Sequence, residues 1–130
     1  MTVMRMTPIY LATDMDEAQR HYERLGLHAR ATDEPGCVGY FDDTNTSRVI
    51  VVGDRHAAKT MPPAAIEVLR KKGGIYVWVH SIDATEIDGE VLGETLTPYG
   101  TRERFIATDD SLTVLAEKLD HFIEIPRRTN

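Results

Sequence analysis

Histidine and cysteine are the side chains of this sequence best suited to nucleophilic or metal chemistry, and they are poorly partnered. Four of the five histidines, His21, His28, His56 and His121, have no partner at ligand spacing, so a solvated or hydrogen-bonded imidazole is expected at each. The single cysteine, Cys37, is expected to be a small strand residue rather than a nucleophile. The sequence shows no Ser-His-Asp order, Cys-His pair or phosphate-binding glycine loop. These patterns do not indicate covalent catalysis or phosphate transfer.

Aromatic side chains alternate in the run IYVWVH, residues 75–80, which predicts a strand. Because strand side chains point alternately to opposite faces, Tyr76, Trp78 and His80 share one face. The two aromatic rings can stack on a planar or cationic ligand, each contact being worth roughly 0.5–2 kcal/mol. The alternative is that Trp78 is a core or dimer-interface residue, and the pattern leaves both open.

Two arginines, Arg102 and Arg104, lie in the predicted strand 101–108 and offer a different chemistry. Guanidinium groups can clamp an anionic group of a ligand. The alternative is an exposed edge strand on which they pair with Glu103 or a neighbour.

The elements that must position these residues begin with a strand at 7–12, followed at once by a helix. Asp14 is its expected N-cap, Glu17 the capping-box partner three residues later, and Gly26 the residue that ends it. The further expected elements are strands at 27–32, 37–42, 48–53, 75–80 and 101–108, a loop at 54–61, and a short helix that begins at Pro62 and Pro63 and is closed by Gly73 and Gly74.

Two regions are ambiguous. Residues 83–96 are acidic and interrupted by glycines, with room for at most a helical turn and a short strand. Residues 111–122 fit helical spacing and strand alternation equally well, so their pattern does not decide between helix and strand.

Composition indicates a single globular domain. The chain has 130 residues, of which 42% are hydrophobic and 28% charged, and its mean hydropathy is -0.32. Its apolar runs are too short to cross a bilayer, so no membrane association is expected. The net charge of -6 disfavours nucleic acid as a partner. The N-terminus lacks the features of a secretory signal, and a lone cysteine suits a reducing compartment, so we expect a cytoplasmic location.

Three segments resemble one known family. They are ATDMDEAQRHYERLGL at 12–27, IYVWVHSIDA at 75–84 and TPYGTRERFIATDDS at 97–111. They are similar to the "A-x-x-[FY]-Y-x-x-L-G" helix, the fifth strand "VYLEVDDVDA" and the closing "TPWG-x-R-E-F-x-V-x-D-P-D-G-N" segment of the vicinal oxygen chelate superfamily. That superfamily includes glyoxalase I, fosfomycin-resistance enzymes, extradiol dioxygenases and bleomycin-resistance proteins.

The resemblance implies an α+β fold in which two βαβββ modules form a curved mixed sheet around a concave cavity. It implies one glyoxalase-like domain over 1–130, with module one at about 1–53, a connecting loop and helix at about 54–73, module two at about 74–117 and a tail at 118–130. It also implies that 112–117 is the final strand. Residues 83–96 depart from the family, which usually has a full helix there.

The resemblance further implies which positions hold the family's divalent metal, and these fall on Thr7, Gly74 and Leu115. None of these residues is an ordinary metal ligand, so the usual metal site is predicted to be absent and no cofactor is expected. His80 and Glu117 are offset candidates, either for a displaced metal or as an acid–base pair.

The same alignment places Gly74 on the inner face of the sheet. The candidate ligand-binding residues are therefore Tyr76, Trp78, Ile9, Leu11, Leu115 and Arg102, with Glu117 beyond Leu115 on the last strand.

Three functions are consistent with this reading. The first is a metal-free small-molecule binding protein that resembles the bleomycin-resistance branch, acts in antibiotic resistance by sequestration, forms a homodimer and takes an aromatic or cationic ligand. The second is a lyase, isomerase or dioxygenase of the glyoxalase type that uses His80 and Glu117. The third is a non-catalytic scaffold or accessory domain whose cavity is filled by its own side chains.

Overall fold

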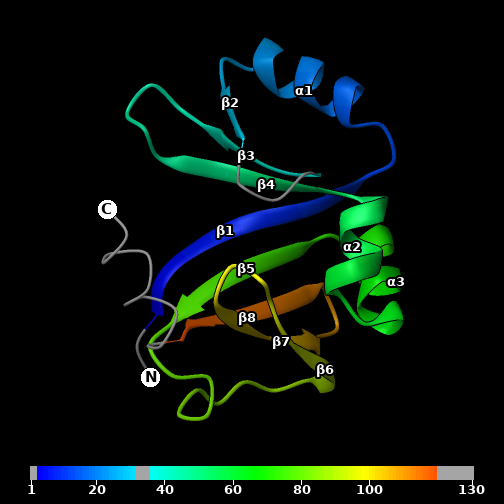
Figure 1. Ribbon diagram of the computed structural model, residues 1–130, viewed down its shortest axis with the longest axis vertical. Helices are drawn as coiled ribbons and strands as arrows, with labels where there is room; N and C mark the ends of the chain where they lie inside the picture. Colours follow the sequence, from blue (N-terminus) through cyan, green and yellow to red (C-terminus); the bar gives the residue numbers. More distant parts are fainter. Residues whose placement is uncertain (1–2, 32–35, 120–130) are drawn as a thin grey trace.

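The computed structural model describes residues 3–31 and 36–119, which form one mixed eight-stranded sheet with three helices (Figure 1). The elements in chain order are β1 (Val3–Ala12), α1 (Met15–Arg24), β2 (His28–Ala31), β3 (Cys37–Phe41), β4 (Ser47–Gly53), α2 (Asp54–Thr60), α3 (Pro63–Lys72), β5 (Gly74–Val79), β6 (Glu90–Leu96), β7 (Thr101–Ala107) and β8 (Leu112–Lys118). None of the helices in these ranges is long and apolar enough to cross a membrane.

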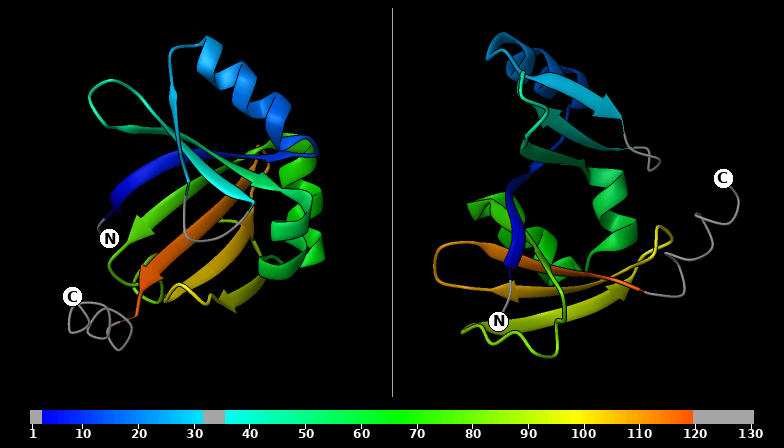
Figure 2. Two further views of the ribbon diagram at one scale, coloured as in Figure 1. Left: turned by 45° about the horizontal axis from the view of Figure 1, so that its top comes forward. Right: turned by 90° about the vertical axis from the view of Figure 1, so that its left-hand side faces the viewer.

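The sheet consists of two halves with the same strand pattern. Its order is β2-β3-β4-β1-β5-β8-β7-β6. In the first half β1 pairs with β4 in parallel, and in the second half β5 pairs with β8 in parallel. An antiparallel pairing of β1 with β5 joins the halves within one chain. The sheet curves around α2, as the right-hand view of Figure 2 shows. The predicted α+β fold with a curved mixed sheet is confirmed.

Helix α1 covers the convex face of the first half. The Asp14 side chain accepts a 3.0 Å hydrogen bond from the Glu17 backbone N–H, as the capping pattern predicts. Gly26 follows the helix with a φ of 91°, a conformation that favours glycine. Partly buried Ala18 and Tyr22 pack against a cluster of buried strand residues that includes Tyr40.

Helices α2 and α3 connect the halves and fill one end of the concave face. The loop predicted at 54–61 is wrong, because Asp54–Thr60 is α2. Its sequence offers no side-chain cap, and the helix is stabilised instead by burial of Ala57 and Thr60. Met61, which follows α2, and Ala65 and Leu69 of α3 extend the same packing. Gly73, with a φ of 74°, then ends α3 directly before β5.

The second half has no counterpart of α1. Residues 80–89 between β5 and β6 contain no helix, which agrees with the departure seen in the sequence. Ile82 in this connection is completely buried and packs with Val77, Val79 and Ile106. The connection therefore covers the convex face of the second half without a helix.

The ambiguous segment near the C-terminus is a strand, β8, as far as the described residues extend. Residues 112–116 are all buried, so both faces of this strand are covered. A strand covered on both sides loses the alternation of apolar and polar residues that normally distinguishes it from a helix. The strand interpretation of 112–117 is confirmed, and residues 120–122 lie outside the described part of the chain.

Candidate functional site

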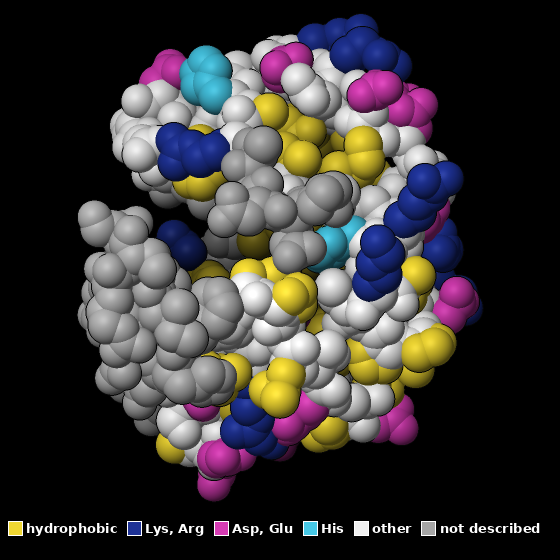
Figure 3. All heavy atoms as spheres, in the orientation of Figure 1, with side chains coloured by type: hydrophobic (Ala, Val, Ile, Leu, Met, Phe, Trp, Pro, Cys, Tyr) yellow, Lys and Arg dark blue, Asp and Glu magenta, His cyan; other side chains and the backbone are white. Residues whose placement is uncertain are grey.

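The concave face of the sheet encloses a cavity of about 380 Å³. Strands of both halves and helix α2 contribute to its wall, so it forms only when the halves pair. In Figure 3 the surface is hollowed between the two halves, and hydrophobic side chains are visible in the recess. The lining residues are Arg5, Ile9, Arg30, Cys37, Gly39, Phe41, Ser47, Ile50, Val52, His56, Thr60, Met61, Tyr76, Trp78, Tyr99, Glu103, Phe105 and Val114.

An aromatic wall is provided by Tyr76 and Trp78 on β5. Their rings meet edge to face, with centroids 5.5 Å apart and an interplanar angle of 68°. In the β1–β5 ladder Arg5 is opposite Trp78 and Ile9 is opposite Gly74. The side chains of Arg5, Ile9 and Trp78 therefore lie on the same face. The structure thus brings together three of the residues predicted from the sequence, namely Ile9, Tyr76 and Trp78.

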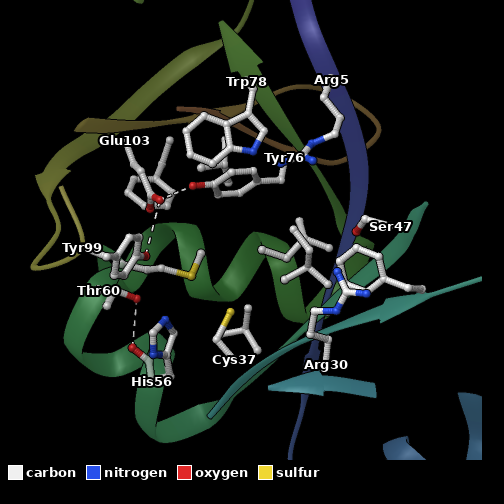
Figure 4. A pocket seen from close by; sticks show the side chains of 18 residues that line it. Arg5, Arg30, Cys37, Ser47, His56, Thr60, Tyr76, Trp78, Tyr99 and Glu103 are labelled. Carbon is white, nitrogen blue, oxygen red and sulfur yellow. Dashed lines mark hydrogen bonds between the residues drawn. The ribbon is translucent and has the colours of Figure 1, made fainter. Parts of the chain in front are cut away.

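A buried carboxyl group, that of Glu103 on β7, lies at one end of the cavity. Glu103 is only 3% exposed. Its Oε2 accepts hydrogen bonds from the hydroxyl groups of Tyr76 and, at 3.5 Å, Tyr99 (Figure 4). The Thr101 hydroxyl donates a third hydrogen bond to the same oxygen at 3.3 Å. Burial raises the pKa of Glu103, and the three hydroxyl donors offset part of that rise. Burial and the neighbouring carboxyl also raise the pKa of Tyr76, so its hydroxyl remains a donor.

Glu103 is not predicted as a site residue from the sequence, where it is considered only as a possible partner for Arg102 and Arg104. The strand alternation of the segment TRERF, residues 101–105, could have identified it. Thr101, Glu103 and Phe105 share one strand face, and all three are buried. A charged residue between two residues of a buried face is exceptional and points to a site.

Two basic side chains lie on the other side of the cavity. Figure 4 shows Arg5 and Arg30, with Ser47, across from Glu103 and Tyr99. The Arg30 guanidinium stacks over the Phe41 ring at 4.0 Å and donates to Asn45 Oδ1. Arg5 is exposed and has no ion pair with any residue in the described ranges.

His56 of α2 is part of the wall between these two ends. It is buried, and its backbone carbonyl accepts a 2.9 Å hydrogen bond from the Thr60 hydroxyl. The sequence could not place it because its segment was predicted to be a loop.

Three predicted ligand-binding residues lie outside the cavity. Leu115 is on the convex face with Val77, because β5 and β8 pair Tyr76 with Val114 and Val77 with Leu115. The predicted orientation of the last strand is therefore wrong by one residue, and Val114 lines the cavity instead. Leu11 is partly buried against the core beyond the cavity.

Arg102 also points away from the cavity, on the outer face of β7. It pairs with Glu94 and Asp83 at 3.0 Å each, not with Glu103. Arg104 pairs with the same two carboxylates. These hydrogen bonds raise the pKa of Arg102 and lower the pKa values of Asp83 and Glu94. The group is a surface ion-pair network that links β7 to β6 and to the connection before it.

The offset candidates His80 and Glu117 are not part of the cavity wall either. His80 is exposed just after β5. The Glu117 carboxylate accepts a 2.6 Å hydrogen bond from the Ile82 backbone N–H, which holds the covering connection in place. The arrangement therefore gives Glu117 a structural contact and does not direct either side chain at a bound ligand.

The described residues do not fit a metal ion. Within residues 3–31 and 36–119, no three His, Cys, Asp or Glu side chains are grouped closely enough to hold one. The side chains of the cavity offer stacking, apolar contact, hydrogen bonding to a carboxyl group and ion pairing with guanidinium groups.

Comparison with known proteins places this fold. No family model matches the sequence, and no curated protein matches it. A solved glyoxalase/bleomycin resistance protein/dioxygenase superfamily member from Vibrio splendidus 12B01 is 13% identical over 90% of this chain and 100% of that chain, with a TM-score of 0.52. A hypothetical protein from Bacillus halodurans C-125 is 17% identical over 88% of this chain and 93% of that chain, with a TM-score of 0.56.

A bleomycin-binding protein solved with bleomycin is 13% identical over 86% of this chain and 96% of that chain, but its TM-score of 0.33 supports no inference here. The two structures with TM-scores above 0.5 cover 90% and 88% of this chain, so the similarity extends over both halves of the sheet. The chain therefore has the vicinal oxygen chelate fold of the glyoxalase/bleomycin resistance protein/dioxygenase superfamily.

Proposed function

We propose that this chain is a non-enzymatic binding protein that holds a small aromatic molecule in the concave cavity. The observation that carries the proposal is a cavity of about 380 Å³ whose wall is mostly apolar and aromatic. That volume lies within the range of roughly 300–1,000 Å³ found for small-molecule sites. The cavity is not filled by the chain's own side chains, which argues against a pure scaffold.

The proposed mechanism is sequestration. Tyr76 and Trp78 stack against the ligand, and Ile9, Ile50 and Val114 remove its apolar surface from water. Binding lowers the free concentration of the ligand without changing it chemically. Resistance to a toxic molecule in the cytoplasm is the role that this activity suits.

Titration calorimetry with a neutral and a cationic biphenyl tests the proposal. We expect saturable binding of one ligand per cavity, together with a change in the emission of Trp78, the only tryptophan of the chain. Ile50→Phe should weaken binding at least about tenfold, because the larger ring occupies the cavity. Leu96→Phe makes a similar enlargement at a side chain that is 69% exposed and should leave binding unchanged. Absence of binding to any aromatic probe would exclude the proposed function.

A homodimer is the second part of the proposal. Met4, Met6 and Tyr10 on the convex side of β1 are 54%, 59% and 46% exposed, and apolar exposure of this kind favours association. Light scattering should give the molar mass of a dimer for the native chain and that of a monomer for Met6→Glu. A monomeric mass for the native chain would contradict this part while leaving the cavity proposal intact.

A further inference from the structure

The polar groups of the cavity are separated by charge. The Glu103 carboxyl, with the hydroxyls of Tyr76 and Tyr99, lies at one end, and Arg5 and Arg30 lie across from it (Figure 4). Aromatic and aliphatic side chains form the wall between them. A cavity that served only to bind an apolar molecule would not need either charged group, so this separation requires an explanation.

At the Glu103 end, residues 3–31 and 36–119 provide no cationic partner. None of the ion pairs among the described residues involves Glu103, although it is only 3% exposed. Its partners are three hydroxyl groups, which are neutral donors. Burial of a carboxyl group without a cation is unfavourable, and an ion pair with a positively charged group of a ligand offsets this cost.

At the arginine end, the described part of the chain provides no anionic partner. Among the described residues, no Asp or Glu forms an ion pair with Arg5 or Arg30. The Arg30 guanidinium is oriented by its stacking on Phe41 and by its hydrogen bond to Asn45. Guanidinium groups recognise planar carboxylates with two parallel hydrogen bonds.

We propose that the ligand of this cavity is amphoteric: an aromatic molecule with an amino or amidino group at the Glu103 end and a carboxylate at the Arg5 and Arg30 end. This inference rests on the proposed function and specifies its ligand class. Tyr76 and Trp78 contact the aromatic centre of the molecule between these two ends. The net charge of the ligand is then near zero, which suits a cavity with one acidic and one basic end.

Four biphenyl probes of equal length test the inference. The first has an aminomethyl group at one end and a carboxylate at the other, the second and third each replace one of these groups by methyl, and the fourth is neutral at both ends. Calorimetry should show that the amphoteric probe binds at least about tenfold more tightly than either singly charged probe. The same set on a naphthalene centre checks a shorter separation of the charges.

Variants assign each end of the probe to its partner. Glu103→Gln keeps an acceptor for the three hydroxyls. It should abolish the gain in affinity that the amino group gives a probe, and it should preserve the gain in affinity from the carboxylate. Tyr76→Phe, which releases one hydroxyl from Glu103, should change affinity for the amino probes alone and serves if Glu103→Gln does not fold. Arg5→Gln should reduce only the gain in affinity from the carboxylate. The reduction should be about threefold, since an exposed guanidinium such as that of Arg5 contributes little to an ion pair. Arg55→Gln, at an exposed arginine of α2 outside the cavity, is the matched control.

Two results would overturn the inference, and they are distinguishable. If the neutral probe binds as tightly as the amphoteric one, the cavity binds aromatic molecules and the proposed function stands, but the assignment of charged ends is wrong. If no probe of either series binds, the proposed function fails together with the inference.

Discussion

The two halves of the sheet share one strand pattern but differ in what covers their convex faces. In the first half the cover is α1, a ten-residue helix that contributes no fully buried residue. In the second half it is the connection 80–89, which has no helix but contains the completely buried Ile82. The comparison teaches that the fold requires apolar cover over the convex face and does not require that cover to be a helix.

The two covers are attached by different means. Helix α1 depends on its own N-cap at Asp14 and on partial burial of one face. The connection 80–89 is anchored through the Ile82 side chain, through the bond from its N–H to Glu117, and through ion pairs of Asp83. Substitutions in the two covers should therefore affect stability to different extents.

The largest expected effect is at Ile82. Ile82→Ala removes a fully buried side chain and should lower the free energy of unfolding by about 2–5 kcal/mol, measured by urea titration. Ile87→Ala in the same connection, at a side chain that is 40% exposed, is the control and should cost much less. Equal effects of the two substitutions would show that the connection does not act as the cover of the second half.

A smaller effect is expected at the cap of α1. Asp14→Ala leaves the Glu17 N–H without its acceptor and should lower the free energy of unfolding by about 1 kcal/mol. Asp14→Ser retains a capping oxygen and should restore most of the loss. If Asp14→Ala destabilised the chain as much as Ile82→Ala, the proposed difference between the two covers would be wrong.

The smallest expected effect is in the ion-pair network. Hydrogen bonds from Arg102, followed by those from Arg104, lower the pKa of Glu94 in the folded chain. The Glu94 carboxylate therefore stabilises the folded chain above its usual pKa, and this stabilisation is lost as the pH falls through its lower pKa in the folded chain. Because the Glu94 side chain is 34% exposed, Glu94→Gln should cost less than about 1 kcal/mol at neutral pH.

The pH dependence provides the check on this last prediction. The free energies of unfolding of the native chain and of Glu94→Gln, from urea titrations, should converge as the pH falls from about 7 through the lowered folded-state pKa of Glu94, because the carboxylate is then protonated in both states. A difference that stayed constant over this range would show that Glu94 contributes by packing and not by charge.

The fold was more accessible from sequence than the site. Local signals were sufficient for α1, where the cap, the periodicity and Gly26 agree, and for β5, where aromatic and branched residues alternate. They failed for α2, which has no side-chain cap and is stabilised by contacts with the core. For β8 the burial of both faces removed the alternation on which orientation depends, and Leu115 was consequently assigned to the wrong face.

The site depends on information that no single segment contains. Tyr76 on β5 and Glu103 on β7 are separated by one strand, β8, and their side chains meet across it. In the sequence they belong to two separate motifs. Arg30 and His56 became part of the wall through the curvature of the sheet and the position of α2. Pairing of strands distant in sequence, not local propensity, determines which polar groups meet in the cavity.

The antiparallel pairing of β1 with β5 has a consequence for the chain during its synthesis. β1 is made before β5, so one of its two edges has no partner until β5 has been synthesised. Unpaired strand edges are templates for association with other chains, and the exposed Met4 and Met6 add apolar surface to this one. A nascent or truncated chain that ends before β5 is thus expected to aggregate. Chaperone binding to β1 would prevent this aggregation until β5 has been synthesised.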